Sequence, residues 1–163
     1  MQKPTTEDSP LAAAQKILAD AIPFRCTGAE PSTLVQALGR VLYADVAAPE
    51  DSPPYPRAIA EGFAVNTADT RAAAEQAPVT FRIAGEVRPG DGACPPIAPG
   101  TGVRVSTGSL LPDGPISVVR MWDCRVQGDR FTVTRPFPPR FFIEEQGCEV
   151  ARGQVLLAGG STL

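Results

Sequence analysis

The sequence predicts a mainly β protein with a few short helices, in which a β-rich module is inserted into a second module built from both ends of the chain. The chain of 163 residues contains 15 glycines and 18 prolines, which favours turns because proline in a helix interior costs about 3 kcal/mol. Apolar residues make up 43% of it, enough for a buried core. Proline clusters at 49–56 and 136–139 then separate the β-rich module, residues 51–135, from the second module, residues 10–50 and 136–163.

Helices are predicted mainly near the start of the chain. Ser9-Pro10 is typical of a helix N-terminus, because serine caps the first turn and proline is tolerated at the first helical position. Apolar residues recur at helical spacing up to Ile22, so we expect an amphipathic helix over residues 10–22. Its apolar stripe must pack against another surface. Shorter helices are expected over residues 32–38 and 66–76.

Extended segments are predicted where apolar and polar residues alternate. They cover residues 40–46, 79–87, 102–107, 116–126, 131–134 and 154–157. Gly128-Asp129, between two apolar runs, indicates a hairpin.

Composition and charge exclude several function classes. The formal net charge is −3 and the isoelectric point is near 5.0, which disfavours binding to nucleic acid or to an anionic membrane surface. The chain has no histidine, so catalysis by a serine or cysteine nucleophile with a histidine base is excluded. The four cysteines form no C-x-x-C pair. No apolar run approaches 18 residues, and we expect a cytoplasmic protein with free thiols.

Three ordered segments carry a family resemblance. Residues 34–65 read LVQALGRVLYADVAAPEDSPPYPRAIAEGFAV, residues 103–119 read VRVSTGSLLPDGPISVV, and residues 147–163 read GCEVARGQVLLAGGSTL. Their order and spacing resemble the N-terminal region of the molybdopterin molybdenumtransferase (MoeA) family, which includes the gephyrin E-domain. The corresponding family patterns include P-P-F-D-R-S-A-M-D-G-Y-A-V and R-I-M-T-G-A-P-L-P.

The resemblance implies a fold, partners and an activity. In the family this region forms an elongated helix-and-strand domain that makes a homodimer, with a β-rich domain inserted in it. Family members insert molybdate into adenylylated molybdopterin with the help of a divalent cation such as Mg²⁺. A third, α/β domain forms the main floor of their cleft and follows the point where this chain stops. We therefore expect this chain to complete a cleft, to bind no cofactor tightly, and to be inactive without an α/β molybdopterin-binding domain or an active paralogue.

The same resemblance implies candidate site residues. Glu61 stands at the aspartate of D-G-Y-A, and is the one weak candidate for contact with a cation. Thr107 and Gly108 stand at T-G, where a hydroxyl and backbone N–H groups could bind an anion, and Arg57 matches the family arginine. Each also has a simpler interpretation. Glu61 suits a solvated loop, Thr107-Gly108 suits a strand-ending turn, and Arg57 suits a surface ion pair with Glu61 or Asp51.

Departures from the family pattern leave a second interpretation open. Ala58 and Phe63 lack the hydroxyls of the family serine and tyrosine, and a basic family segment is here acidic, with Glu144, Glu145 and Glu149. Such an acidic segment would repel an anionic substrate. The alternative is a stand-alone, non-catalytic scaffold or binding protein with a degenerate site.

Overall fold

The computed structural model describes residues 9–22 and 28–163, and its contacts divide the chain into two units. One unit comprises residues 1–45 with 158–163, and the other comprises residues 46–157. The domain boundaries predicted from the proline clusters stay a prediction.

The first unit contains the predicted amphipathic helix. Helix α1, Pro10–Ala21, is capped by Ser9, whose hydroxyl accepts a hydrogen bond from the Ala12 N–H at 3.1 Å, so the Ser-Pro prediction is confirmed. The helix predicted over residues 32–38 is only a 3₁₀ turn, η2, Val35–Ala37. An isolated segment of this length is too short to repay the cost of nucleating an α-helix. No described helix has the length and apolar character that a membrane span requires.

Residues from both ends of the chain pair in this unit. The Gly39 N–H donates to the Leu163 carbonyl at 2.8 Å, and the Leu163 N–H donates to the Arg40 carbonyl at 2.9 Å. The predicted extended segment 40–46 contributes an isolated bridge between Val41 and Thr162, and its last residue, Val46, begins a two-residue strand of the other unit. Many large apolar side chains of this unit are more than half exposed in the single chain. They are Leu11, Ile17, Leu18, Ile22, Leu34, Val35, Leu38, Val41 and Tyr43.

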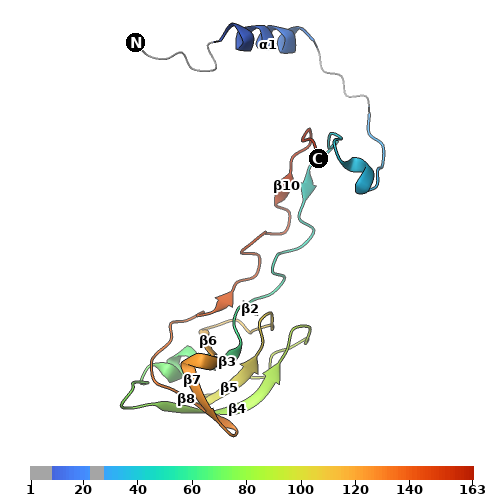
Figure 1. Cartoon of the computed structure of the whole chain (residues 1–163). Coiled ribbons are helices and arrows are strands. Elements are labelled where there is room, and N and C mark those ends of the chain that lie inside the picture. Colours follow the sequence, from blue (N-terminus) through green and yellow to red (C-terminus); the bar gives the residue numbers. More distant parts are fainter. Residues whose placement is uncertain (1–8, 23–27) are drawn as a thin grey trace, which may run out of the picture. The chain divides into compact units, whose positions relative to one another are not determined.

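The second unit is built on a six-stranded sheet with the order β6-β3-β5-β4-β8-β7 (Figure 1). All neighbours are antiparallel except β4 and β5. The strands are β3 Gly62–Asn66, β4 Val79–Val87, β5 Thr101–Val105, β6 Ile116–Arg120, β7 Cys124–Gln127 and β8 Arg130–Val133. Two small ladders pair β1 Val46–Ala47 with β10 Val155–Leu157, and β2 Arg57–Ala58 with β9 Ile143–Glu144. The predicted mainly β fold is confirmed.

The helix and strand predictions for this unit need two corrections. The predicted helix 66–76 is a 3₁₀ turn, η3, Thr67–Thr70. The predicted strand 116–126 is interrupted by a second 3₁₀ turn, η4, Met121–Asp123. This turn joins β6 to β7, which are the two edges of the sheet. Three residues can span only about 10 Å, so the sheet must curl until its edges approach each other.

Aromatic side chains fill the inside of the curled sheet. The rings of Phe63 and Phe131 stack with centroids 4.0 Å apart, and those of Phe81 and Phe131 are 5.1 Å apart. Phe63 is on β3 and Phe131 is on β8, with β5 and β4 between them in the sheet. In a flat sheet these two strands would be about 14 Å apart, so their contact is a direct measure of the curl.

The two faces of the sheet have separate buried clusters. The inner cluster surrounds the phenylalanine stack: Phe63, Val65, Ala73, Phe81, Val119, Phe131, Val133 and Phe137. The outer cluster contains Ala58, Ala64, Val87, Val103, Val105, Leu111, Ile116 and Val118. Strand β3 is therefore buried on both faces.

Gly102 on β5 permits the phenylalanine stack. A Cβ atom at this position would lie 2.6 Å from the ring of Phe131, which is itself held between two other rings. We expect Gly102→Ala to lower the free energy of unfolding by about 1–3 kcal/mol, the usual cost of overpacking a core. Urea unfolding would measure it.

A matched control for this prediction is Gly92→Ala. Nothing lies within 4 Å of a Cβ at Gly92, so this change should be neutral or slightly stabilising. Phe131→Leu would make room for the new methyl group, and Gly102→Ala should cost less in that background. Equal effects of the two alanines would contradict the packing argument.

Candidate functional site

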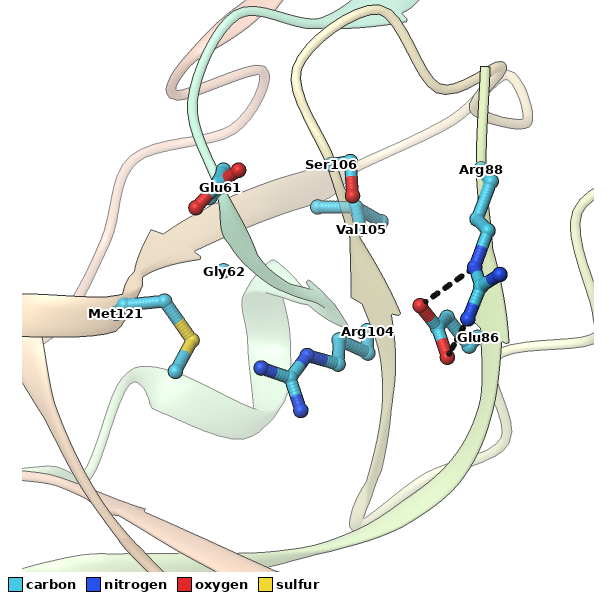
Figure 2. A pocket seen from close by; sticks show the side chains of 8 residues that line it. All are labelled: Glu61, Gly62, Glu86, Arg88, Arg104, Val105, Ser106 and Met121. Atoms are coloured by element: carbon cyan, nitrogen blue, oxygen red, sulfur yellow. Dashed lines mark hydrogen bonds and ion pairs between the residues drawn. The ribbon is translucent and has the colours of Figure 1, made fainter. Parts of the chain in front are cut away.

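A cavity of about 350 Å³ opens at one end of the curled sheet (Figure 2). The start of β3, the ends of β4 and β5, and the end of β6 meet there. Its polar lining comes from Glu61, Glu86, Arg88, Arg104 and Ser106. Met121 supplies an apolar side chain, and the backbone near Gly62 and Val105 completes the wall.

An irregularity in β4 directs two charged side chains toward this cavity. Phe81 and Ile83 pack in the inner cluster, and strict alternation would place Val87 with them. The register against β5 instead shifts between Ile83 and Gly85, as in a β-bulge. Val87 is therefore buried in the outer cluster. Glu86, and Arg88 beyond the strand end, line the cavity on the inner side.

Glu86 and Arg88 form a two-contact ion pair. Arg88 Nε lies 2.9 Å from one carboxylate oxygen of Glu86 and Nη2 lies 3.4 Å from the other. The hydrogen bond from Arg88 lowers the pKa of Glu86, and the charges of Arg88 and Arg104 act in the same direction. Glu86 is therefore ionised and neutralised by its partner at neutral pH.

Glu61 is the residue immediately before β3. Its side chain is exposed and lines the cavity, and its carbonyl accepts a hydrogen bond from the Met121 N–H at 3.1 Å. This bond continues the β3–β6 pairing and ties the loop before β3 to turn η4. Glu61 is the predicted site residue that the structure places in the cavity.

Thr107 and Gly108 form a turn after β5, next to Ser106 of the cavity wall. The Thr107 side chain is exposed, and neither residue lines the cavity. The Gly108 N–H, a predicted anion donor, donates to the Ala58 carbonyl at 2.8 Å. Gly108 adopts a φ of 90°, which favours glycine. In this conformation the Thr107 hydroxyl is available to a ligand, whereas the Gly108 N–H already donates to Ala58.

Arg57 lies outside the cavity lining. Its Nε lies 2.6 Å from Glu144 and its Nη2 lies 3.3 Å from Glu149. The expected alternative of an ion pair holds, with different partners from Glu61 and Asp51. Arg57 and Glu144 also face each other in the β2–β9 ladder, so this pair holds residues 140–150, the return segment, against β2.

The features that suggested a degenerate site have structural explanations. Ala58 and Phe63 are fully buried in the two clusters. The side chains at these two positions therefore do not line the open cavity. The acidic segment was predicted to repel anions; this stays a prediction, and two arginines partly neutralise its three carboxylates. Glu144 and Glu149 pair with Arg57, and Arg140 pairs with the third carboxylate of this segment, Glu145.

The described residues do not form a metal site by themselves. No group of three or more acidic or cysteine side chains suited to a cation occurs in this part of the chain. Within the cavity, Glu86 is already paired, which leaves Glu61 as a single carboxylate. A Mg²⁺ ion normally needs further oxygens from water and substrate phosphate, so no step is assigned to a metal here.

Comparison with known proteins decides the family. The family model of the MoeA N-terminal region, domains I and II, matches residues 9–163. The chain belongs to this family. The molybdopterin molybdenumtransferase of Synechococcus elongatus is 34% identical over 132 residues, which cover 80% of this chain and 32% of the relative. The Staphylococcus aureus enzyme is 27% identical over 130 residues, 80% of this chain and 31% of the relative.

Solved structures agree with this assignment. The crystal structure of the molybdopterin biosynthesis moeA protein from Pyrococcus horikoshii OT3 superimposes with a TM-score of 0.83 at 33% identity. The match covers 94% of this chain and 40% of that one. The chain thus spans about a third of the length of the curated relatives it matches. The family predicted from the three motifs is confirmed.

Asp123 fixes turn η4 and with it one wall of the cavity. Its carboxylate accepts a hydrogen bond from Arg120 Nε at 2.6 Å and forms an ion pair with Arg135 Nη2 at 3.2 Å. Hydrogen bonding from Arg120 holds the pKa of Asp123 below its ordinary value, and Arg135 acts in the same direction. The side chain is only 13% exposed, so these contacts are poorly screened by water.

We expect Asp123→Asn to lower the free energy of unfolding at pH 7 by about 1–3 kcal/mol. Because the folded pKa is depressed, the contribution is complete above the unfolded pKa of about 3.9 and is lost as the pH falls through the folded value. Urea unfolding at pH 7, 5 and 3 should show the difference between variant and parent shrinking at pH 3. Asp113→Asn, in an exposed turn, is the control; a difference that persists undiminished at low pH would contradict the assignment.

Proposed function

We propose that this chain provides the dimerising, cleft-completing part of a MoeA-like protein that inserts molybdate into adenylylated molybdopterin. The observation that carries the proposal is the family match over residues 9–163, with a carboxylate, Glu61, in an open cavity. Relatives with the printed name molybdopterin molybdenumtransferase support it. The described thiols, Cys94, Cys124 and Cys148, are free, as expected for work in a reducing cytoplasm.

The roles of this chain's residues follow from its geometry. Glu61 accepts a hydrogen bond from the substrate. Thr107, exposed in the next turn, donates its hydroxyl to an anionic group. The pterin and the transferred oxyanion are held mainly by an α/β domain, so the 163-residue chain alone does not turn over.

A second copy of this chain is the proposed partner of the first unit. Helix α1 buries none of its residues, although Leu11, Leu18 and Ile22 form an apolar stripe on one side. A stripe of this kind gains about 25 cal/mol for each Å² removed from water. The family resemblance supports a homodimer as the means of covering it.

Charge placed on the stripe should break the proposed dimer. We expect the chain to sediment as a dimer in analytical ultracentrifugation, and Leu18→Glu to raise the dissociation constant at least tenfold. The matched control is Ala13→Glu, which puts the same charge on the opposite side of α1 and should leave the mass unchanged. A monomeric parent chain, or equal behaviour of the two variants, would reject the dimer.

The cleft role of Glu61 predicts a loss of activity. In the natural protein that carries this chain, we expect Glu61→Gln to lower the rate of molybdenum cofactor formation from adenylylated molybdopterin and molybdate about tenfold or more. Thr107→Val should give a smaller loss, and Glu50→Gln, an exposed residue outside the cavity, should give none.

The 163-residue chain assayed alone gives the complementary result. We expect no cofactor formation above the uncatalysed rate. Turnover by the isolated chain, or full activity of Glu61→Gln, would overturn the proposed division of roles.

A further inference from the structure

Arg104 lines the cavity with an exposed side chain, and within the described residues it has no ion pair. It lies on β5, directly opposite Phe63 of β3 and Glu86 of β4. Its side chain therefore leaves the sheet on the inner face, just beyond the phenylalanine stack. Figure 2 shows the guanidinium extending into the space between Met121 and the Glu86–Arg88 pair.

The charges around the cavity leave Arg104 available to a ligand. Glu86 is already engaged by Arg88 through Nε and Nη2. Within the described residues, Arg104 has neither an ion pair nor a hydrogen bond from its guanidinium. An arginine fork matches a phosphate or a carboxylate with two parallel hydrogen bonds. An anion is the ligand group that this position suits.

Across the cavity from Arg104 the lining carries a negative charge, that of Glu61. Glu61 is a carboxylate and accepts hydrogen bonds only. The hydroxyl of Ser106 has no partner in the described part of the chain, and it lies with Glu61 on the opposite side from Arg104 in the view of Figure 2. The cavity of about 350 Å³ is in the range of small-ligand sites.

We propose that this cavity binds a small ligand at two ends: a phosphate or similar oxyanion held by Arg104, and an N–H or O–H donor held by Glu61. The inference deepens the proposed function and rests on it only for the use of Glu61. It adds Arg104 as the residue that anchors the anionic end, beside the exposed Glu86–Arg88 pair of the cavity wall. The bulge in β4 is what places that wall inside the sheet.

Binding of two probes to the full 163-residue chain tests the proposal. Pyrophosphate carries the anion alone, and phosphoethanolamine carries an anion with an ammonium donor. Both are titrated at pH 8 and low ionic strength while backbone amide signals are followed by NMR. We expect saturable shifts at Gly62, Val105 and Ser106 with both probes.

Arginine variants test the anionic end. We expect Arg104→Gln to weaken both probes at least tenfold. Arg82→Gln removes an exposed arginine of β4 outside the cavity and should change binding less than twofold. If Arg104→Gln does not fold, Arg104→Lys keeps the charge without the fork and should bind severalfold more weakly than the parent. If the chemical shifts do not saturate, or if Arg82→Gln and Arg104→Gln lose the same affinity, the probes bind only to general surface charge. Either result would overturn the proposal.

A glutamate variant tests the donor end by the sign of its effect. Glu61→Gln removes repulsion of pyrophosphate and should tighten its binding at least twofold, whereas phosphoethanolamine loses its ammonium partner and should bind at least threefold more weakly. Changes in the same direction would overturn the role of Glu61. None of these measurements uses turnover, so an inactive protein with intact probe binding rejects the proposed function alone, and an active protein without probe binding rejects this inference alone.

Discussion

The contact between Phe63 on β3 and Phe131 on β8 is the constraint on which the sheet unit depends. Two strands separated by two others can touch only if the sheet closes on itself, and the 4.0 Å stack shows that it does. Gly102 is required because a methyl group there would enter the Phe131 ring. The same closure lets the three residues of η4 connect the two sheet edges. The cavity is the open end of the curled sheet, just beyond the stacked phenylalanines, where Arg104 lines the inner side.

Core packing and site geometry are coupled through the bulge in β4. Burying a valine side chain contributes about 1.5–3 kcal/mol, and Val87 obtains this in the outer cluster only because the register shifts before Gly85. The shift reverses the alternation of the residues that follow. As a result, the Glu86 side chain points to the inner side of the sheet, opposite Arg104. The charged wall of the cavity is thus stabilised by an apolar residue on the opposite face, which itself takes no part in binding.

Local sequence patterns predicted several elements correctly, but not the two short helices or the face of the sheet on which each side chain lies. The Ser9-Pro10 cap, the strand over residues 79–87 and the hairpin at Gly128-Asp129 follow from local chemistry, and the structure contains all three. The family motifs singled out Glu61, and this residue lines the cavity. Arg104 and Glu86 were missed because alternation in single strands cannot reveal a bulge or which strands become neighbours. The parallel β4–β5 pairing that brings the two together joins segments whose connection the sequence pattern leaves undefined.

The distribution of charge explains why substitutions in the return segment do not imply a lost site. Glu144 and Glu149 lie against Arg57, and Glu145 lies against Arg140, which also donates to the Pro112 and Gly114 carbonyls. These carboxylates hold the return segment to β2 and to the loop before β6. The cavity draws its charges from different strands and keeps a carboxylate and an unpaired guanidinium on opposite sides. Arg104 is exposed to solvent and lies opposite Glu86 on the neighbouring strand, so its guanidinium can reach a ligand without first breaking an ion pair.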